Sequence, residues 1–65
     1  MFIPRKKHGI KGEVCLITGA GNGIGRHLAL QIAKQSAVVI CVDIKEASNI
    51  ETAEMIKASG GMAFA

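Results

Sequence analysis

The stretch Thr18-Gly19-Ala20-Gly21-Asn22-Gly23-Ile24-Gly25 constrains this chain more than any other part of its sequence. An apolar run, Val14–Ile17, precedes the stretch and a segment with helical spacing follows it, so we expect a loop between a strand and a helix. The first amides of a helix lack intrahelical partners and carry about half a positive charge, which suits an anion. The stretch therefore indicates a corner that binds phosphate.

Three of the glycines have separate expected roles. Gly19 allows the chain to leave the strand in a tight turn with positive φ. Gly23 leaves room for a pyrophosphate to approach the backbone, and Gly25 lets the helix pack closely on the strand. All three roles require the absence of a Cβ.

The spacing of the glycines excludes two common motifs. A G-x-G-x-x-G pattern that begins at Gly19 would need a glycine where Ile24 stands, and a P-loop would need Gly-Lys followed by Ser or Thr. The residues instead spell T-G-x-x-x-G-x-G, from Thr18 to Gly25.

Apolar runs predict strands over residues 13–18 and 38–42 and the start of a third strand near Met62. The near-continuous apolar character of the first strand is typical of a strand covered on both faces. Strand, helix and strand form a βαβ unit, which is almost always right-handed with parallel strands. The expected fold class is therefore α/β, the first β-α-β-α portion of a Rossmann-type doubly wound parallel sheet with the opening of a further strand.

Helical spacing predicts helices over residues 24–35 and 49–59. Ser48 and Glu51 have the spacing of a capping box for the second helix, which Gly60-Gly61 is expected to end. The side chains expected to face inward are Ile24, Leu28, Ile32, Ile50, Ala53 and Ile56. The side chains of the first helix expected to face water or a neighbouring domain are Arg26, His27, Gln31, Lys34 and Gln35.

Asp43 ends the second strand, 18 positions after Gly25. A carboxylate at that strand end can accept hydrogen bonds from both hydroxyls of an adenosine ribose and would repel a 2′-phosphate. The residue type therefore predicts NAD rather than NADP. Ile44 is expected to form an apolar wall for the adenine ring.

The backbone N–H groups of Asn22 and Ile24 are the expected donors to the pyrophosphate, so their side chains matter less. Thr18 is expected to brace the turn. The residues predicted to bind the cofactor are Gly19, Asn22, Gly23, Ile24, Gly25, Asp43 and Ile44.

The length of 65 residues allows one small domain at most. Such a chain buries only about 60% of its unfolded surface, whereas a complete doubly wound domain runs to about 200 residues. We therefore expect the amino-terminal piece of a longer protein, divided into a basic segment, residues 1–12, and a partial nucleotide-binding domain, residues 13–65. A self-sufficient mini-domain is the alternative.

The net charge of +3 is concentrated in residues 1–12, which contain four cations and no acid, whereas residues 13–65 sum to −1. With two aromatic residues and no recognition motif, nucleic acid is not an expected partner. Residues 2–11 have two open interpretations, a solvated terminus or a stretch beside an anionic membrane surface. The longest apolar run, Ala37–Val42, is far short of the roughly 18 residues that span a bilayer, so we expect a soluble chain.

Cys15 and Cys41 both lie in apolar runs. We expect buried thiols, which indicates a reducing intracellular compartment. No histidine is placed beside them at the spacing of metal ligands, so no metal site is predicted.

The glycine octet and the strand before it resemble the short-chain dehydrogenase/reductase family. Phe2-Ile3-Pro4 with its basic run, Lys11–Val14, Leu16–Gly21 and Gly23–Arg26 are similar to one branch, the 17-beta-hydroxysteroid dehydrogenases type 11 and type 13 and the epidermal retinol dehydrogenases. The resemblance implies NAD-dependent oxidation of a lipophilic alcohol of steroid or retinol type. It also implies a parent protein at the endoplasmic reticulum membrane or lipid droplets, with a hydrophobic anchor ahead of Phe-Ile-Pro that this sequence lacks.

The chain departs from the family where catalysis is concerned. The family uses a Tyr-x-x-x-Lys pair with a Ser and an Asn for proton transfer, and this chain contains no tyrosine. Ser36, Ser48 and Ser59 do not stand at the family's positions. No catalytic residue is therefore assigned, and the chain alone is expected to be inactive.

Two functions from other classes stay open. A methyltransferase that binds S-adenosylmethionine also uses a Gly-x-Gly-x-Gly loop, which residues 19–23 supply, and an acidic residue that ends its second strand. Such enzymes usually place an acidic residue directly before the loop, where this chain has Thr18. A non-catalytic nucleotide-binding module is the other alternative, and the oligomeric state is not predicted.

Overall fold

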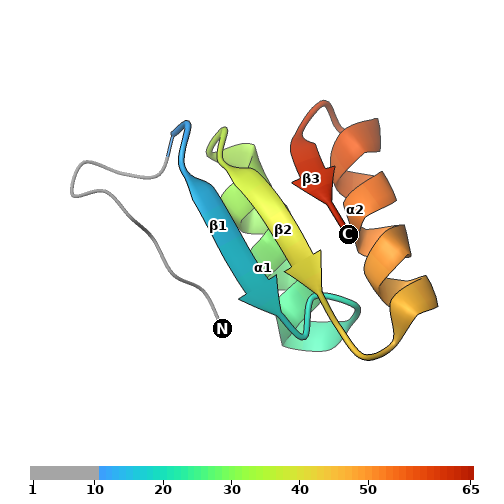
Figure 1. Cartoon of the computed structure of the whole chain (residues 1–65). Helices are drawn as coiled ribbons and strands as arrows, with labels where there is room; N and C mark the ends of the chain where they lie inside the picture. Colours follow the sequence, from blue (N-terminus) through green and yellow to red (C-terminus); the bar gives the residue numbers. More distant parts are fainter. Residues whose placement is uncertain (1–10) are drawn as a thin grey trace.

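The computed structural model describes residues 11–65. Its elements, in chain order, are β1 (Val14–Thr18), α1 (Gly23–Lys34), β2 (Val38–Val42), α2 (Glu46–Ala58) and β3 (Met62–Phe64) (Figure 1). Residues 1–10 of the expected basic segment, residues 1–12, lie outside the described residues, and so do both of its open interpretations, a solvated terminus or a stretch beside a membrane surface.

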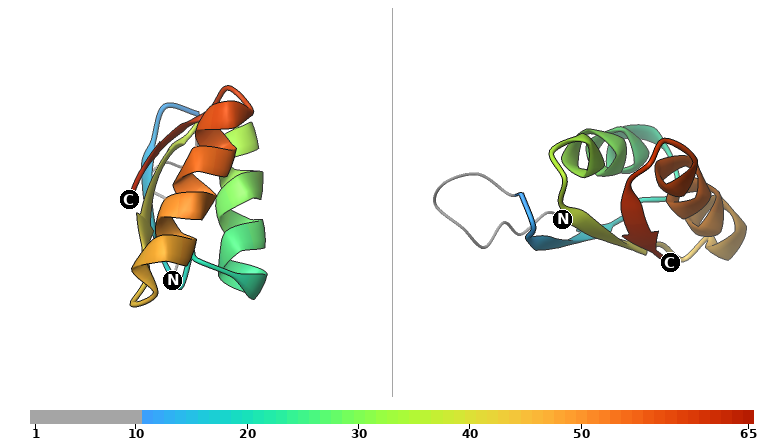
Figure 2. Two further views of the ribbon diagram at one scale, coloured as in Figure 1. Left: turned by 90° about the vertical axis from the view of Figure 1, so that its right-hand side faces the viewer. Right: turned by 90° about the horizontal axis from the view of Figure 1, so that it is seen from above.

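The three strands form one parallel sheet in the order β1-β2-β3. Val14 lies opposite Val38, and Val38 lies opposite Met62. Both helices cover the same face of the sheet, as the two further views show (Figure 2). This arrangement follows from two crossovers of the same hand that progress in the same direction. The predicted β-α-β-α-β order and parallel sheet are confirmed.

The core lies between the sheet and the two helices. Alternate strand residues point into it, namely Cys15, Ile17, Val39, Cys41 and Ala63. They meet the helix residues Ala29, Ile32, Ala33, Ala53 and Ile56. Both cysteines are free and buried, as expected. Burial raises the pKa of each thiol, and Glu13 raises that of Cys15 further, which keeps both thiols protonated.

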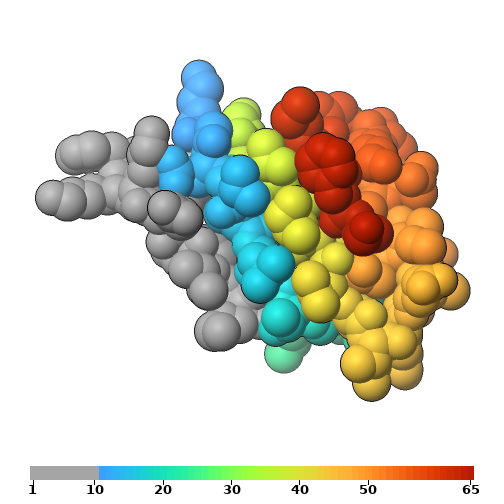
Figure 3. Space-filling view, viewed as in Figure 1, coloured from blue at the N-terminus to red at the C-terminus, as the bar shows by residue number. Residues whose placement is uncertain are grey.

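No helix or strand among residues 11–65 covers the opposite face of the sheet (Figure 3). Its half-buried apolar side chains are Val38 and Ile40, and its exposed ones are Val14, Leu16, Val42, Met62 and Phe64. The expectation that β1 is covered on both faces is therefore wrong for the described part of the chain, because α1 and α2 both lie on the other side.

The start of the second helix differs from the prediction. Helix α2 begins at Glu46, and its N-cap, Lys45, makes no side-chain capping bond. Ser48 lies inside the first turn, so the predicted capping box is wrong. The cause is local: the Asp43 carboxylate accepts the Lys45 N–H at 2.9 Å, and Lys45 in turn accepts the Asn49 N–H at 3.0 Å. The chain therefore turns into the helix earlier than a capping box would allow.

The inward faces of the helices were also misassigned at two positions. Ile24 is 88% exposed and Ile50 is 45% exposed, so neither belongs to the core. The buried row of α2 is Asn49, Thr52, Ala53 and Ile56, which is the i, i+3, i+4, i+7 stripe of an amphipathic helix. The predicted inward positions Ala53 and Ile56 are confirmed. The other two members of that stripe are polar, and a search for apolar residues therefore selected Ile50 in place of Asn49.

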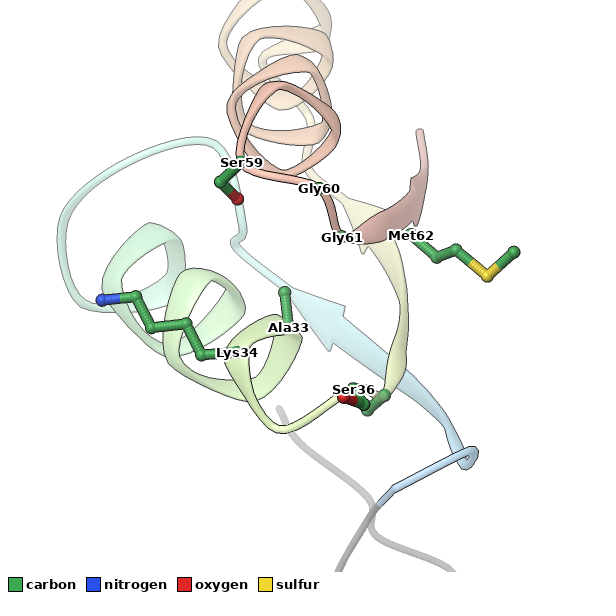
Figure 4. A pocket seen from close by; sticks show the side chains of 8 residues that line it. Ala33, Lys34, Ser36, Ser59, Gly60, Gly61 and Met62 are labelled. Atoms are coloured by element: carbon green, nitrogen blue, oxygen red, sulfur yellow. The ribbon is translucent and has the colours of Figure 1, made fainter.

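A hollow of about 510 Å³ lies where α1 and α2 end, at the amino-terminal ends of β2 and β3 (Figure 4). Its lining includes Lys34, Ser36, Ser59 and Gly61. The glycine loop lies at the other end of the sheet, after the carboxyl end of β1. Neither helix within residues 11–65 has the length and apolar character to cross a membrane.

Candidate nucleotide-binding site

The glycine loop is bonded, where it leaves β1, to the last residue of β2. The N–H groups of Gly19 and Ala20 both donate to the carbonyl of Val42, at 2.7 and 3.2 Å. Gly19 has φ +74, which confirms the expected turn with positive φ. The loop therefore lies beside the end of β2, and the next residue after β2 is Asp43.

Gly25 and Gly23 meet different surroundings. A Cβ at Gly25 would overlap the carbonyl oxygen of Gly19 and lie 2.6 Å from its carbon, so the expected close packing of helix and strand end is confirmed. Gly23 has φ +56, and a Cβ there would meet no described atom within 4 Å. The backbone at Gly23 is thus open to an approaching group.

The start of α1 offers amides rather than side chains. Asn22 is the N-cap, in extended conformation, and its side chain makes no capping bond. The first helical bond runs from the Arg26 N–H to the Asn22 carbonyl at 3.2 Å. The first turn contains no acidic residue. An anion placed here would find helix N–H groups and no carboxylate of the same helix to repel it.

Asp43 faces the glycine loop. Its Oδ2 accepts the Gly21 N–H at 2.8 Å, and its Oδ1 accepts the Lys45 N–H at 2.9 Å. These two bonds, that from Lys45 first, lower the pKa of the Asp43 carboxyl, against a smaller opposing effect of desolvation. The group is therefore a fixed carboxylate at neutral pH, with lone pairs left on both oxygens.

Gly21 is a residue of the site that the sequence analysis missed. A Cβ on it would lie 2.8 Å from Asp43 Oδ2 and 3.1 Å from Ser48 Cβ. Its lack of a side chain allows the carboxylate to reach the loop. The available signal was the strict alternation of glycines from Gly19 to Gly25, in which Gly21 had no assigned role.

Two apolar side chains border this edge without joining the core. Ile44, the residue after Asp43, is 99% exposed, and Ile24, in the first turn of α1, is 88% exposed. Asp43 and Ile44 both line a hollow of about 430 Å³, together with Asn49 and Ile50. The structure thus brings together a carboxylate, open helix amides and bare apolar side chains. Among residues 11–65, no group of metal-ligating side chains accompanies them.

Arg26 does not face water as expected. Its side chain is 24% exposed and crosses from α1 to α2. Its Nε donates to Thr52 Oγ1 at 2.8 Å, and its terminal nitrogen donates to Glu51 Oε1 at 2.6 Å and to the Ser48 carbonyl at 3.2 Å. Helical spacing within α1 could not reveal these partners, because all of them belong to the next helix.

The stability of the chain should depend on acid pH through Asp43. Folding lowers the pKa of this carboxyl, so its stabilising effect is complete above the ordinary aspartate pKa of about 3.9. The effect is lost as the pH falls through the folded-state value. We expect the thermal midpoint to fall between about pH 4 and pH 2, and to fall less in Asp43→Asn. Equal losses in both proteins, measured by circular dichroism, would contradict this assignment.

Known proteins are similar to this chain in sequence. The model of the short chain dehydrogenase family matches residues 13–65. Over 56 residues the chain is 47% identical to short-chain dehydrogenase/reductase family 16C member 6 of Bos taurus, covering 86% of this chain and 18% of that protein. It is 46% identical over 56 residues to retinol dehydrogenase 10-B of Danio rerio, covering 86% and 17%. It is 43% identical over 59 residues to epidermal retinol dehydrogenase 2 of Homo sapiens, covering 91% and 19%. The chain spans less than a fifth of the length of these relatives.

Solved structures share the fold. A hydroxysteroid dehydrogenase from Escherichia coli superposes with a TM-score of 0.82 at 36% identity, covering 86% of this chain and 24% of that one. A short chain dehydrogenase/reductase from Burkholderia phymatum in complex with NAD gives 0.83 at 29% identity, covering 89% and 21%. A 3-oxoacyl (acyl-carrier-protein) reductase from Agrobacterium tumefaciens with NADP bound gives 0.73 at 37%, covering 85% and 21%. The resemblance of the glycine octet is thereby confirmed, and the chain belongs to the short chain dehydrogenase family.

Proposed function

We propose that this chain is the amino-terminal, coenzyme-binding part of an NAD-dependent oxidoreductase that acts on a lipophilic alcohol of steroid or retinol type. The observation that supports this most directly is the Asp43 carboxylate, held at the end of β2 by the Gly21 N–H at 2.8 Å. In an open α/β sheet, ligands bind at the carboxyl ends of the strands, where this carboxylate lies.

The proposed binding surface has three parts. The amides of Asn22 and Ile24 would bind the diphosphate at the start of α1, where Gly23 leaves the backbone open. Asp43 would accept hydrogen bonds from the adenosine ribose. Ile44, bare and beside Asp43, would pack against the adenine ring. The coenzyme, once bound, supplies the hydride chemistry, and these residues bind and orient its adenosine half.

The choice of NAD over NADP rests on this chain's own charge. Similar structures hold NAD in one case and NADP in another, so family membership leaves the choice open. A 2′-phosphate beside Asp43 would meet an ionised carboxylate. Lys45 donates its backbone N–H to that carboxylate at 2.9 Å, and the Lys45 charge lowers the pKa of Asp43 less than this bond does. We therefore propose NAD as the coenzyme.

The proposed substrate class follows from the names of the relatives. They include retinol dehydrogenases and, among solved structures, a hydroxysteroid dehydrogenase. Retinol and steroid alcohols are both large and apolar. A location at the endoplasmic reticulum membrane or at lipid droplets remains part of this proposal for the longer protein.

Coenzyme titration tests this assignment. The chain is titrated in parallel with NAD, NADP and S-adenosylmethionine, and binding is followed by calorimetry. We expect NAD to bind more than about tenfold tighter than NADP, because like charges that meet in a site are strongly unfavourable. S-adenosylmethionine should not bind, since the chain belongs to the dehydrogenase family. Equal or tighter binding of NADP would contradict the coenzyme assignment, and preferential binding of S-adenosylmethionine would favour the methyltransferase alternative.

The isolated chain is expected to bind coenzyme without turning over substrate. It contains no tyrosine, and hydride transfer between an alcohol and NAD requires a group that takes the hydroxyl proton. Fluorescence of NADH should stay at the level of the blank when NAD and retinol or a steroid alcohol are added. Calorimetry on the same sample shows whether NAD is bound. NADH formation above the blank would contradict the prediction.

A further inference from the structure

The peptide group between Ala20 and Gly21, in the middle of the glycine loop, is hydrogen-bonded at both ends. Its carbonyl oxygen accepts the Thr52 hydroxyl at 2.7 Å, and its N–H donates to Asp43 Oδ2 at 2.8 Å. Because a peptide group is planar and trans, the direction of its C=O fixes the direction of its N–H. A rotation of this group would therefore break both bonds at once.

The Thr52 hydroxyl has one proton and several neighbours. The side chain is fully buried, and its oxygen lies 2.8 Å from Arg26 Nε, 2.7 Å from the Ala20 carbonyl and 3.2 Å from the Ser48 carbonyl. Arginine only donates, so Oγ1 accepts from Arg26 and gives its own proton to a carbonyl. The shorter distance favours Ala20. A donated bond from a cation also strengthens the bond that the hydroxyl makes onward.

Arg26 is itself held in place. Its terminal nitrogen is bonded to Glu51 and to the Ser48 carbonyl, both on α2. Its backbone lies in α1, directly after the loop, with its N–H bonded to Asn22. The hydrogen bonds thus connect Arg26 on α1 to Thr52 on α2, and Thr52 to the Ala20 carbonyl in the middle of the loop.

We propose that Arg26 and Thr52 are positioning residues for coenzyme binding: the Arg26–Thr52 pair fixes the Ala20–Gly21 peptide group, and that group holds the Asp43 carboxylate towards the ribose. The coenzyme part of this inference rests on the proposed function. The clamp itself, Arg26 to Thr52 to Ala20–Gly21 to Asp43, can be measured without any ligand.

Loss of the Thr52 hydroxyl releases one end of the peptide group. The Gly21 N–H then leaves Asp43 Oδ2 for part of the time, and the carboxylate loses one of its two backbone donors. We expect NAD to bind about tenfold more weakly, as for the loss of one hydrogen bond to a charged group.

The test compares Thr52→Val, which keeps the shape and removes the hydroxyl, with Thr52→Ser, which keeps the hydroxyl. Two quantities are read by NMR on the coenzyme-free chain: the Asp43 carboxyl pKa and the chemical shift of the Gly21 amide proton. In Thr52→Val the Asp43 pKa should rise and the Gly21 amide should move towards the position of a weaker hydrogen bond. Thr52→Ser should restore both, and Arg26→Met should change both in the same direction by less.

Matched controls lie at the far end of α2. Ser59→Ala removes a hydroxyl that donates to the Ile56 carbonyl, and Lys57→Met removes a cation paired with Glu54. Neither contact involves the loop, so both NMR quantities and the affinity for NAD should stay at wild-type values.

The outcomes distinguish the clamp from the binding of the coenzyme. An unchanged Asp43 pKa and Gly21 amide in folded Thr52→Val would overturn the clamp. If Thr52→Val does not fold, the same two NMR quantities are measured in Arg26→Met, which we expect to fold because the Arg26 side chain is partly exposed. Wild-type values of both quantities in Arg26→Met would also overturn the clamp. If both NMR quantities respond as expected but the wild-type chain does not bind NAD, the clamp stands and the proposed function is wrong.

Discussion

Gly25→Ala is expected to unfold most of the chain or to lower its thermal midpoint by about 10 °C or more. The new Cβ would overlap the Gly19 carbonyl and lie 3.2 Å from the Ala20 nitrogen, and these are backbone atoms that cannot move aside as a side chain can. Such overpacking costs about 1–3 kcal/mol or more, and a domain this small has a total stability of roughly 3–5 kcal/mol. In a domain of this size, each kcal/mol corresponds to roughly 4–8 °C. The midpoint is measured by circular dichroism.

Gly60→Ala is the matched control for this substitution. Gly60 has φ +93, but a Cβ there would meet nothing within 4 Å. Alanine at Gly60 thus adds backbone strain of about 1–2 kcal/mol and no overlap, whereas Gly25→Ala adds overlap. A loss of stability in Gly60→Ala equal to that in Gly25→Ala would show that the close contact of Gly25 with Gly19 is not what matters.

Asp43→Asn is expected to weaken NAD binding by about ten- to a hundredfold, the range for hydrogen bonds to a charged group. Asparagine keeps the shape but presents one NH₂ group to backbone donors, where the carboxylate accepts from both Gly21 and Lys45. The preference for NAD over NADP should shrink in the same variant, because the negative charge that repels a 2′-phosphate is gone. Calorimetric titration with both coenzymes measures both effects.

Glu54→Gln controls for the change in net charge. Glu54 is exposed on α2, eleven positions after Asp43, and its carboxylate pairs with the Lys57 ammonium group at 3.4 Å. Within the described residues it does not line the hollow beside Asp43 and makes none of the contacts to the loop that Asp43 makes. Its substitution should leave both affinities within about twofold, the range expected for a screened surface charge. If the control variant loses as much NAD affinity as Asp43→Asn, the effect comes from net charge, and the specific role of Asp43 is contradicted.

Much of the fold could be predicted from the sequence because strong local signals coincide there. Strand β2 spans Val38–Val42 as expected, since an apolar run of β-branched residues ends at a charged residue. The start of α1 follows from the glycine loop, and β3 from the glycine pair before Met62. In each case one short segment contains the whole signal.

Helix α2 was less predictable because two of its core positions are polar. Asn49 donates to the Cys41 carbonyl at 2.9 Å, and Thr52 donates to the Ala20 carbonyl. A polar residue that is buried by contacts with distant segments looks like a surface residue when only the sequence is read. The prediction therefore placed Ile50 inside, where the structure has Asn49.

The candidate site shows the same limit. The position of Asp43 at a strand end predicted that it would lie near the glycine loop, and it does. The contacts of Gly21 and Thr52 were not predictable, because they join segments more than 20 positions apart whose approach depends on how the helices pack. Strand-end position is encoded locally, whereas hydrogen-bond partners across elements are not.

The proposed coenzyme site is tested most directly by mapping the backbone amides that respond to NAD. In ¹H–¹⁵N correlation spectra of the chain, addition of NAD should shift the amides of residues 21–25 and of Ile44, while those of Ser36 and Gly61, at the hollow on the other end of the sheet, should stay in place. The largest shifts at Ser36 and Gly61, or saturable binding of NAD without shifts at residues 21–25, would contradict it.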